Sequence, residues 1–325
     1  MANDCYIHIG AEKCGSTTIQ KSLEINHEYL KKNKILVPKG LGRNTGPLNH
    51  AKLVVASYRD NQKDDLTEIF YKNQKREDFL VDCLKSIKNK KNLIRDNNFS
   101  TILSAEHFSS RLRKENIGNF KKLVDQLSSN FKIIFIIRNQ MDWHISAYNT
   151  FIRCGGKKTF EEWIKVSLMQ RSADWLLITS QWEKYFGFGN VFVLPLRDKS
   201  NNKSLDERFY DCCEINSEII KNFKKPKKLN ESLNIYLLEK IRIINEKMPW
   251  IINGAINQER TKAIQEEINL FEEKIKFNKE KIFNNYSNEK YINNELKEYV
   301  FNIYSESNSK LLKKYPHLEI EIKGF

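Results

Sequence analysis

Small residues, hydroxyls and a lysine are concentrated near the start of the chain, in the stretch Gly10-Ala-Glu-Lys-Cys-Gly-Ser-Thr-Thr18. An apolar segment precedes it and an amphipathic one follows, which indicates a loop between a strand and a helix. Glycines let such a loop turn tightly, and the helix adds its N-terminal amides and positive dipole end. With Lys13 as a point charge and the hydroxyls of Ser16, Thr17 and Thr18 as donors, the loop predicts a site for a phosphate-like anion.

The position of the lysine separates this loop from the phosphate loop of kinases and NTPases. That motif reads GxxxxGK[ST], with the lysine directly after the second glycine. Gly10 and Gly15 have the required separation, but Ser16 stands in the lysine position and the lysine is at 13. A kinase lysine runs along the β- and γ-phosphates, and Lys13 would reach a different atom. A kinase or NTPase with a degenerate loop stays an alternative, as does a non-catalytic anion-binding protein.

The loop resembles the donor-binding loop of sulfotransferases that use 3′-phosphoadenosine-5′-phosphosulfate (PAPS), whose pattern is roughly PKxGTT after a strand. Lys13, Gly15 and the two threonines match, whereas Glu12 replaces the proline and Ser16 follows the glycine. The resemblance implies that PAPS is the co-substrate and is bound by Lys13, Cys14, Gly15, Ser16, Thr17 and Thr18. It also implies that Lys13 stabilises the charge that develops on the bridging oxygen during transfer.

A second element of that family is an arginine at the end of a strand, followed eight residues later by a serine. Arg138 follows the apolar run 132–137, and Ser146 stands eight residues further on. The resemblance implies that these two hold the 3′-phosphate of the donor, and an arginine fork suits phosphate oxygens. The segments 146–155, 159–163, 191–196 and 230–233 also resemble bacterial glycan-type sulfotransferases, whereas residues 246–325 carry no such resemblance.

Sulfuryl transfer to a hydroxyl needs a group that accepts the hydroxyl proton. Glu106 and His107 follow the apolar run 100–104, and the carboxyl end of a strand in an open α/β sheet opens onto the ligand crevice. Similar enzymes also use residues from the segment after the first helix, where His50 lies. We expect Glu106 as the base, with His50 and then His107 as alternatives. No cysteine or histidine cluster has metal-ligand spacing, and we expect no metal.

Four short apolar runs predict the strands that must position these residues. The runs are buried-strand candidates bounded by polar residues, and they cover 5–9, 100–104, 132–137 and 191–194. Helical patterns lie between them, over 16–32, 141–152, 159–166 and 176–185. This alternation predicts an α/β fold, and with the resemblance it predicts a P-loop-like three-layer sandwich with a central parallel sheet.

The chain changes character after a lysine-rich break at 222–232, one of four polar breaks, with 41–50, 87–100 and 198–204. We expect a PAPS-binding core over residues 1–225 and a helical C-terminal extension over 226–325, packed on the core. Ile264, Ile268, Phe271 and Ile275 form one apolar stripe at helical spacing. That stripe is typical of a helix packed on a core, and an arm of a homodimer is the alternative.

The composition bounds the partners. The 325 residues include 55 Lys and Arg against 41 Asp and Glu, a formal net charge of +14. This excess favours an anionic partner or a lysine-rich solvated surface. No motif that reads nucleic-acid bases is present, so we expect no nucleic acid as partner. We expect a hydroxylated acceptor, such as a saccharide, a glycolipid or a small metabolite. Peripheral contact with a membrane-linked glycan stays open. Six cysteines without CxxC spacing and no long apolar run indicate a reducing compartment, and we expect a cytoplasmic bacterial protein.

Overall fold

The computed structural model describes residues 4–42, 48–72, 74–198, 202–226, 233–277 and 292–322. Contacts group the chain into two compact units, each made of separate stretches of sequence. Unit 1 comprises Met1–Arg138, Trp175–Leu229 and Lys310–Phe325, and unit 2 comprises Asn139–Asp174 and Asn230–Ser309. Among the described residues, none of the helices has both the length and the apolar composition that crossing a membrane requires.

Unit 1 is built on a parallel sheet of five strands in the order β2-β3-β1-β4-β5. The strands are β1 (Asp4–His8), β2 (Ile35–Leu36), β3 (Ser100–Ser104), β4 (Asn130–Ile137) and β5 (Val191–Pro195). β1 and β4 are buried over most of their length, as strands covered on both faces are. All four predicted strands are present, and the short edge strand β2 is additional because two apolar residues give no periodic signal.

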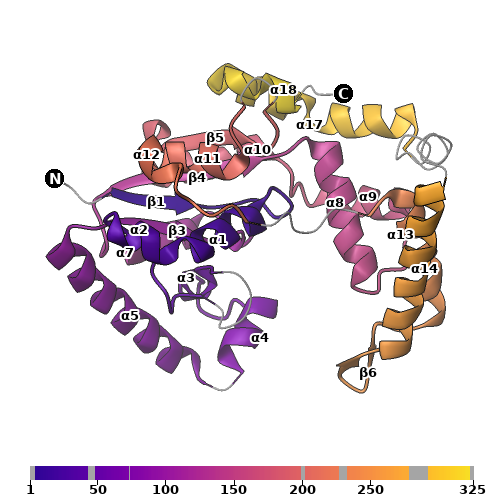
Figure 1. Cartoon of the computed structure of the whole chain (residues 1–325), viewed down its shortest axis with the longest axis horizontal. Coiled ribbons are helices and arrows are strands. Elements are labelled where there is room, and N and C mark those ends of the chain that lie inside the picture. Colours follow the sequence, from indigo (N-terminus) through magenta and orange to yellow (C-terminus); the bar gives the residue numbers. More distant parts are fainter. Residues whose placement is uncertain are drawn as a thin grey trace. The chain divides into compact units, whose positions relative to one another are not determined.

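Helices fill every connection between these strands (Figure 1). α1 (Ser16–Ile25) and α2 (His27–Lys32) lie between β1 and β2, and α3 (Ala51–Ala56), α4 (Asp65–Tyr71) and α5 (Arg76–Asn97) lie between β2 and β3. α6 (His107–Arg111) and α7 (Glu115–Val124) lie between β3 and β4, and α10 (Trp175–Phe186) and the short 3₁₀ helix Phe188–Asn190 are the part of unit 1 between β4 and β5. Two more helices of unit 1, α11 (Leu205–Cys212) and α12 (Ser217–Ile220), follow β5.

The direction of each connection decides which face of the sheet its helices cover. The chain runs one way along the sheet from β1 to β2 and the opposite way in the three later connections. Because such crossovers are right-handed, the two directions place helices on opposite faces. Consistent with this, α1 contacts α11, whereas α10 contacts α7, β4 and β5. The predicted α/β fold, with a central parallel sheet between helical layers, is confirmed.

Two local predictions in unit 1 were wrong. The helix expected over 16–32 is two helices separated at Asn26, whose side-chain amide donates to the carbonyls of Ser22 and Lys224 at 3.0 Å each. The polar break expected over 87–100 is the second half of α5, which continues to Asn97. Ile87 and Ile94 are buried there and lie seven residues apart, so a sparse apolar stripe on a charged helix was mistaken for a loop.

The end of the chain covers the outer edge of the sheet. After α17 (Asn294–Lys314), the chain forms a 3₁₀ turn at Pro316–Leu318 and α18 (Glu319–Ile322). The Tyr315 hydroxyl donates to the Val191 carbonyl at 3.2 Å, and His317 Nε2 donates to the Val193 carbonyl at 2.8 Å. These bonds occupy carbonyls of β5 that an edge strand would otherwise present to other chains.

Unit 2 is mainly helical. It holds α8 (Gln140–Arg153), α9 (Phe160–Met169), α13 (Ile235–Lys247), α14 (Gln258–Phe277) and most of α17, with a small hairpin of β6 (Ile251–Ile252) and β7 (Ala255–Ile256) between α13 and α14. Buried Arg260 donates from its Nε to Asn245 Oδ1 at 2.8 Å and from Nη2 to the Arg153 carbonyl at 2.9 Å. Its charge therefore lies at the C-terminal end of α8, where a cation is favourable.

The two units differ from the predicted division at residue 225. Residues 139–174 group with the C-terminal helices, and residues from 310 onward group with the sheet. The predicted boundary borders 227–232, which are outside the described residues, as is most of the stretch 230–233 used in the resemblance. Of the predicted apolar stripe on α14, Ile264, Ile268 and Phe271 are half-buried, and the Ile275 side chain is outside the described part of the chain. The hairpin was not predicted.

Candidate donor and acceptor site

The loop between β1 and α1 turns through three residues with positive φ, namely Gly10 at 55°, Lys13 at 66° and Gly15 at 83°. A Cβ on Gly10 would lie 2.8 Å from the Cα of Glu106, and one on Gly15 would lie 2.5 Å from Leu205 Cδ2. The positive φ favours glycine at both positions. Space requires it at Gly10, because the close atom there is backbone, whereas the ends of leucine side chains near Gly15 can shift. The loop is thereby held against the end of β3.

Cys14 and Ser16 shape the inside of this loop. The Cys14 amide donates to the Ala11 carbonyl at 3.1 Å, and the Ser16 hydroxyl donates to the same carbonyl at 3.3 Å. Both side chains are buried, and burial raises the pKa of the Cys14 thiol. Lys13, Thr17 and Thr18, by contrast, are half-buried. Of the six residues expected to contact the donor, the side chains with access to solvent are therefore those of Lys13 and the two threonines.

Helix α1 begins directly at the loop, with Gly15 as its N-cap in the left-handed conformation. No side chain caps its first amides, and its first turn contains no acidic residue. The first amides of a helix have no partner within it, and the dipole makes this end favourable for an anion. The start of α1 thus has the backbone geometry that a phosphate cradle needs, and phosphate binding by this loop stays a prediction.

Arg138, the first residue after β4, joins the loop from the neighbouring strand. Its Nη1 donates to the carbonyl of Lys13 at 3.3 Å, and its own carbonyl accepts from Trp175 Nε1 at 2.8 Å. Two residues that were expected to bind the sulfate donor, 125 positions apart in sequence, are therefore in direct contact. Ser146 is half-buried on α8 and belongs to unit 2. The predicted Arg138–Ser146 pair combines one residue from each unit and stays a prediction.

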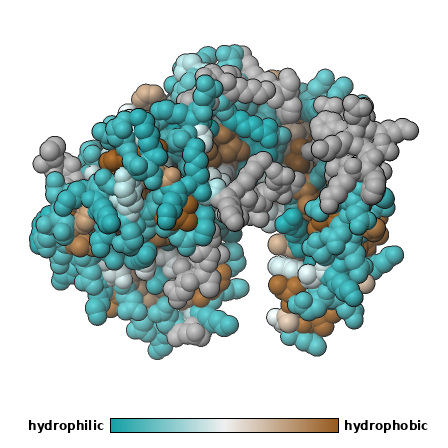
Figure 2. All heavy atoms as spheres, in the orientation of Figure 1, coloured by the Kyte–Doolittle hydropathy of each residue, from teal (hydrophilic) through white to brown (hydrophobic). Residues whose placement is uncertain are grey.

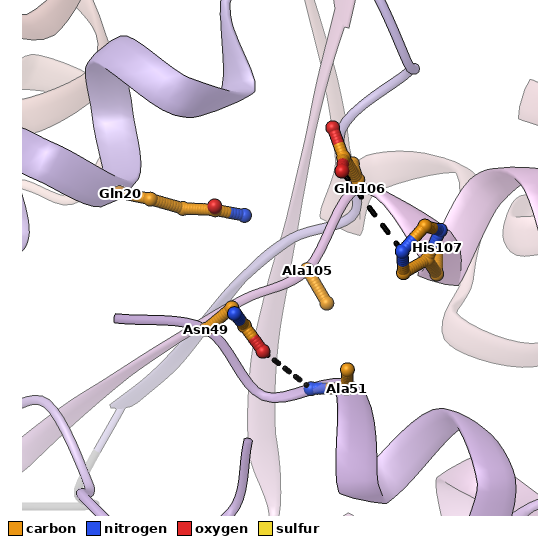
Figure 3. A pocket seen from close by; sticks show the side chains of 6 residues that line it. All are labelled: Gln20, Asn49, Ala51, Ala105, Glu106 and His107. Atoms are coloured by element: carbon orange, nitrogen blue, oxygen red, sulfur yellow. Dashed lines mark hydrogen bonds and ion pairs between the residues drawn. The ribbon is translucent and has the colours of Figure 1, made fainter. Parts of the chain in front are cut away.

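A small pocket lies beside the end of β3, lined by Gln20, Asn49, Ala51, Ala105, Glu106 and His107 (Figure 3). The Glu106 side chain is 37% exposed and that of His107 is 14% exposed, with Glu106 Oε1 3.9 Å from His107 Nε2. Gln20 comes from α1, the helix that follows the donor loop. Because Gly10 contacts the backbone of Glu106, the donor loop and this pocket are adjacent.

Glu12 is a site residue to which the sequence pattern assigned no role. Its Oε1 accepts from the Ser110 hydroxyl at 2.9 Å and lies 3.5 Å from His107 Nδ1. Burial raises the pKa of Glu12, but the interactions with His107, Ser110 and Arg111 outweigh burial and lower it to about 2. His107 therefore lies between two carboxylates. The signal that could have found Glu12 was its departure from the proline of the donor-loop pattern.

The expectation that His50 could act as the base is wrong. It is fully buried and lies outside the pocket lining, although Asn49 and Ala51 belong to that lining. Its Nδ1 accepts from the Ser104 amide at 2.9 Å, and its Nε2 donates to the Pro38 carbonyl at 3.0 Å. Burial lowers the pKa of His50 to about 4, against smaller opposing effects of these backbone contacts. His50 thus ties β3 to the segment after β2 as a neutral ring.

No protein-family model and no curated protein matches the chain. The structure is similar to a crystal structure described as a sulfotransferase from Alicyclobacillus acidocaldarius. The two proteins share 12% sequence identity, the match covers 71% of this chain and 87% of the other, and the TM-score is 0.44. A likeness of this size establishes neither a family nor an activity.

Proposed function

We propose that this protein is a sulfotransferase that moves the sulfuryl group of PAPS to a hydroxyl of an acceptor. The observation that carries the proposal is the contact between the Arg138 guanidinium and the Lys13 carbonyl. The contact joins the glycine-containing loop after β1, which we propose binds an anion, to the positive charge of Arg138 after β4. Phosphate oxygens on two sides of a nucleotide need two such sources of positive charge close together.

On this proposal, the loop and α1 hold the 5′ end of the donor. The amides at the start of α1, with the hydroxyls of Thr17 and Thr18, donate to the 5′-phosphate. Arg138 donates to the 3′-phosphate, for which its planar fork is suited. We assign Ser146 as the second donor to that phosphate, on the resemblance alone.

Transfer breaks the bond between sulfur and the oxygen that bridges it to the 5′-phosphate, and forms a bond between sulfur and the acceptor oxygen. Adenosine 3′,5′-bisphosphate leaves with the electron pair of the broken bond. The Lys13 ammonium stabilises the negative charge that develops on the bridging oxygen. The acceptor hydroxyl gives its proton to the Glu106 carboxylate, whose position in the pocket beside Gly10 supports this role.

His107 is the second candidate for the base, and one observation favours it. Glu12 lies 3.5 Å from its Nδ1, and a carboxylate in that position stabilises a protonated imidazole. Proton transfer to Nε2 would then leave a cation between Glu12 and Glu106. For the acceptor we propose a hydroxylated saccharide, glycolipid or small metabolite, because the net charge of +14 favours an anionic or polar glycan surface over an apolar one. A cytoplasmic location remains part of the proposal.

Binding of nucleotides tests the donor assignment. We would measure the thermal shift produced by adenosine 3′,5′-bisphosphate, adenosine 5′-monophosphate and ATP with Mg²⁺. We expect the bisphosphate to bind tightest, and Arg138→Ala to weaken it at least tenfold while weakening the monophosphate little, because only one ligand carries the 3′-phosphate. Lys13→Ala should weaken both, and Lys88→Ala, an exposed lysine on α5, should change neither. Tighter binding of ATP, or equal effects of Arg138→Ala on both adenosine ligands, would refute the assignment.

A further inference from the structure

The hairpin in unit 2 exposes three isoleucines close together. Ile251 is 49% exposed, Ile252 47% and Ile256 54%. Single exposed apolar residues are common on protein surfaces, but a contiguous apolar group marks an interaction site. In Figure 2, hydrophobic residues gather at the end of unit 2 where Figure 1 places β6. We call residues 250–256 the apolar hairpin.

The turn and the base of the apolar hairpin are defined by local contacts. Asn253 and Gly254 form its two-residue turn with φ of 51° and 78°, the pair of positive values that a type I′ turn requires. At its base, the Asn257 amide donates to the Trp250 carbonyl at 2.9 Å. Trp250 packs so closely on the chain after α8 that a Cβ on Gly155 would lie 2.6 Å from Trp250 Cβ. The isoleucines thus lie between a defined turn and a defined base.

Both faces of the apolar hairpin are apolar. Ile251 pairs with Ile256 across the hairpin, and Ile252 pairs with Ala255, so successive pairs point to opposite faces. A groove on another protein, or a second copy of this chain, would cover one face and leave the other in water. A lipid layer surrounds an inserted hairpin on both faces. Two strand residues and a turn span about 7 Å, comparable to the depth of about 5–10 Å that interfacial segments reach.

Basic residues are frequent in the two segments that meet at the base of the apolar hairpin. The two segments that meet there, 153–158 and 246–259, contain Arg153, Lys157, Lys158 and Lys247 against Glu246 and Glu259, and Gly155 and Trp250 are the contact between them. All four basic residues are exposed. Glu246 forms an ion pair with Arg242 at 2.5 Å, so its negative charge offsets less of the positive charge of the four basic residues. An apolar tip with a basic rim and a tryptophan at the boundary is suited to an anionic lipid surface.

We propose that the apolar hairpin inserts into the interface of anionic membranes, with Ile251, Ile252 and Ile256 among the upper acyl chains and the basic rim against lipid phosphates. The inference depends on unit 2 alone and stands whether or not the protein transfers sulfate. Together with the proposed function, it favours an acceptor that is itself attached to lipid.

Sedimentation with lipid vesicles tests the proposal on the full chain. We would use vesicles of phosphatidylcholine alone and vesicles with 30% phosphatidylglycerol. We expect the wild type to bind the anionic vesicles at least tenfold more tightly than the neutral ones, because each basic residue near such a surface adds about 1 kcal/mol, roughly fivefold in affinity. Ile251→Ser combined with Ile252→Ser and Ile256→Ser should weaken binding to anionic vesicles at least tenfold.

Two further variants separate the apolar and the basic contributions. Lys157→Gln with Lys158→Gln should weaken binding to anionic vesicles at least fivefold and leave binding to neutral ones unchanged. Leu270→Ser, which removes an apolar residue that is 51% exposed on α14, should change neither and serves as the matched control. Thermal melting of each variant checks that it is folded.

Three results would overturn the proposal. One is a wild type that does not sediment with anionic vesicles. Another is a folded triple serine variant that binds them as tightly as the wild type. A third is dimerisation of the wild type on gel filtration that the triple variant abolishes without any vesicle binding, which would assign the apolar hairpin to a second copy of the chain. Binding of adenosine 3′,5′-bisphosphate should be the same in all these variants, so a failure here is distinct from a failure of the donor assignment.

Discussion

Glu106 and His107 are separated as candidates for the base by the loss of rate that each substitution causes. We would measure the release of sulfate from PAPS, with water as the acceptor. Glu106→Gln should lower this rate by about 10²–10⁴-fold.

His107→Asn provides the comparison. We expect a decrease of about tenfold with an unchanged pH profile if His107 only positions Glu106. A pH profile of the wild-type rate that Glu12→Gln shifts would instead assign the proton to His107. In that case Glu12, at 3.5 Å from the ring, is the positioning residue.

His50 predicts how stability depends on pH. Burial lowers its pKa to about 4 in the folded protein, against an ordinary value of about 6.5 in the unfolded chain. The unfolded state therefore takes up the proton first as the pH falls, so this contribution to stability is complete above about pH 6.5 and is lost toward pH 4. We expect His50→Gln to flatten the pH dependence of the free energy of unfolding in this range by roughly 3 kcal/mol, measured by urea denaturation. A variant with the same slope as the wild type would contradict the assignment.

At the scale of elements, the loop between β1 and α1 needs glycine at position 10 both for its positive φ and for lack of space. Comparison with Gly40 distinguishes the two effects. Gly10 has a positive φ and a close contact to Glu106, whereas Gly40 has a φ of 87° and no atom within 4 Å of the point where a Cβ would lie. Gly40→Ala should cost about 1 kcal/mol from strain alone. Gly10→Ala should cost about 2–4 kcal/mol and weaken bisphosphate binding at least tenfold. Equal destabilisation by the two variants would contradict the close packing at Gly10.

These elements also show how much the sequence could predict. The strands β1, β3, β4 and β5 were predicted because continuous apolar runs occur where both faces of a sheet are covered. The loop residues were predicted because glycine spacing and a following helix have a direct physical meaning. That Lys13 and Arg138 both bind the donor was expected from the resemblance. Their contact across neighbouring strands was not predicted, since periodicity contains no strand order.

The errors have physical causes as well. His50 was assigned by its place in the sequence, and its burial between the Ser104 amide and the Pro38 carbonyl depends on tertiary packing that no local pattern encodes. Glu12 was noted only as a mismatch, because its contact with His107 joins residues far apart in the sequence. The apolar hairpin was missed because two strands of two residues each are too short to show alternation.

At the scale of the whole molecule, the chain passes between its two units four times, after residues 138, 174, 229 and 309. A chain ended at the predicted core boundary, residue 225, would keep 139–174 without the helices α13 and α14 that group with them. It would also lose Tyr315 and His317, which bond to carbonyls of the edge strand β5. Both losses expose apolar surface and unpaired backbone, which promote aggregation.

We therefore expect residues 1–225 alone to melt at least 10 °C below the full chain, or to elute as aggregates on gel filtration. Removal of residues 315–325 alone should destabilise unit 1 and favour association through β5, because the bonds from Tyr315 and His317 are lost while unit 2 is intact. Removal of residues 323–325 keeps both bonds and is the matched control. If residues 1–225 melt cooperatively as a monomer near the temperature of the full chain, the core is self-sufficient as the sequence suggested, and the two units do not depend on each other for folding.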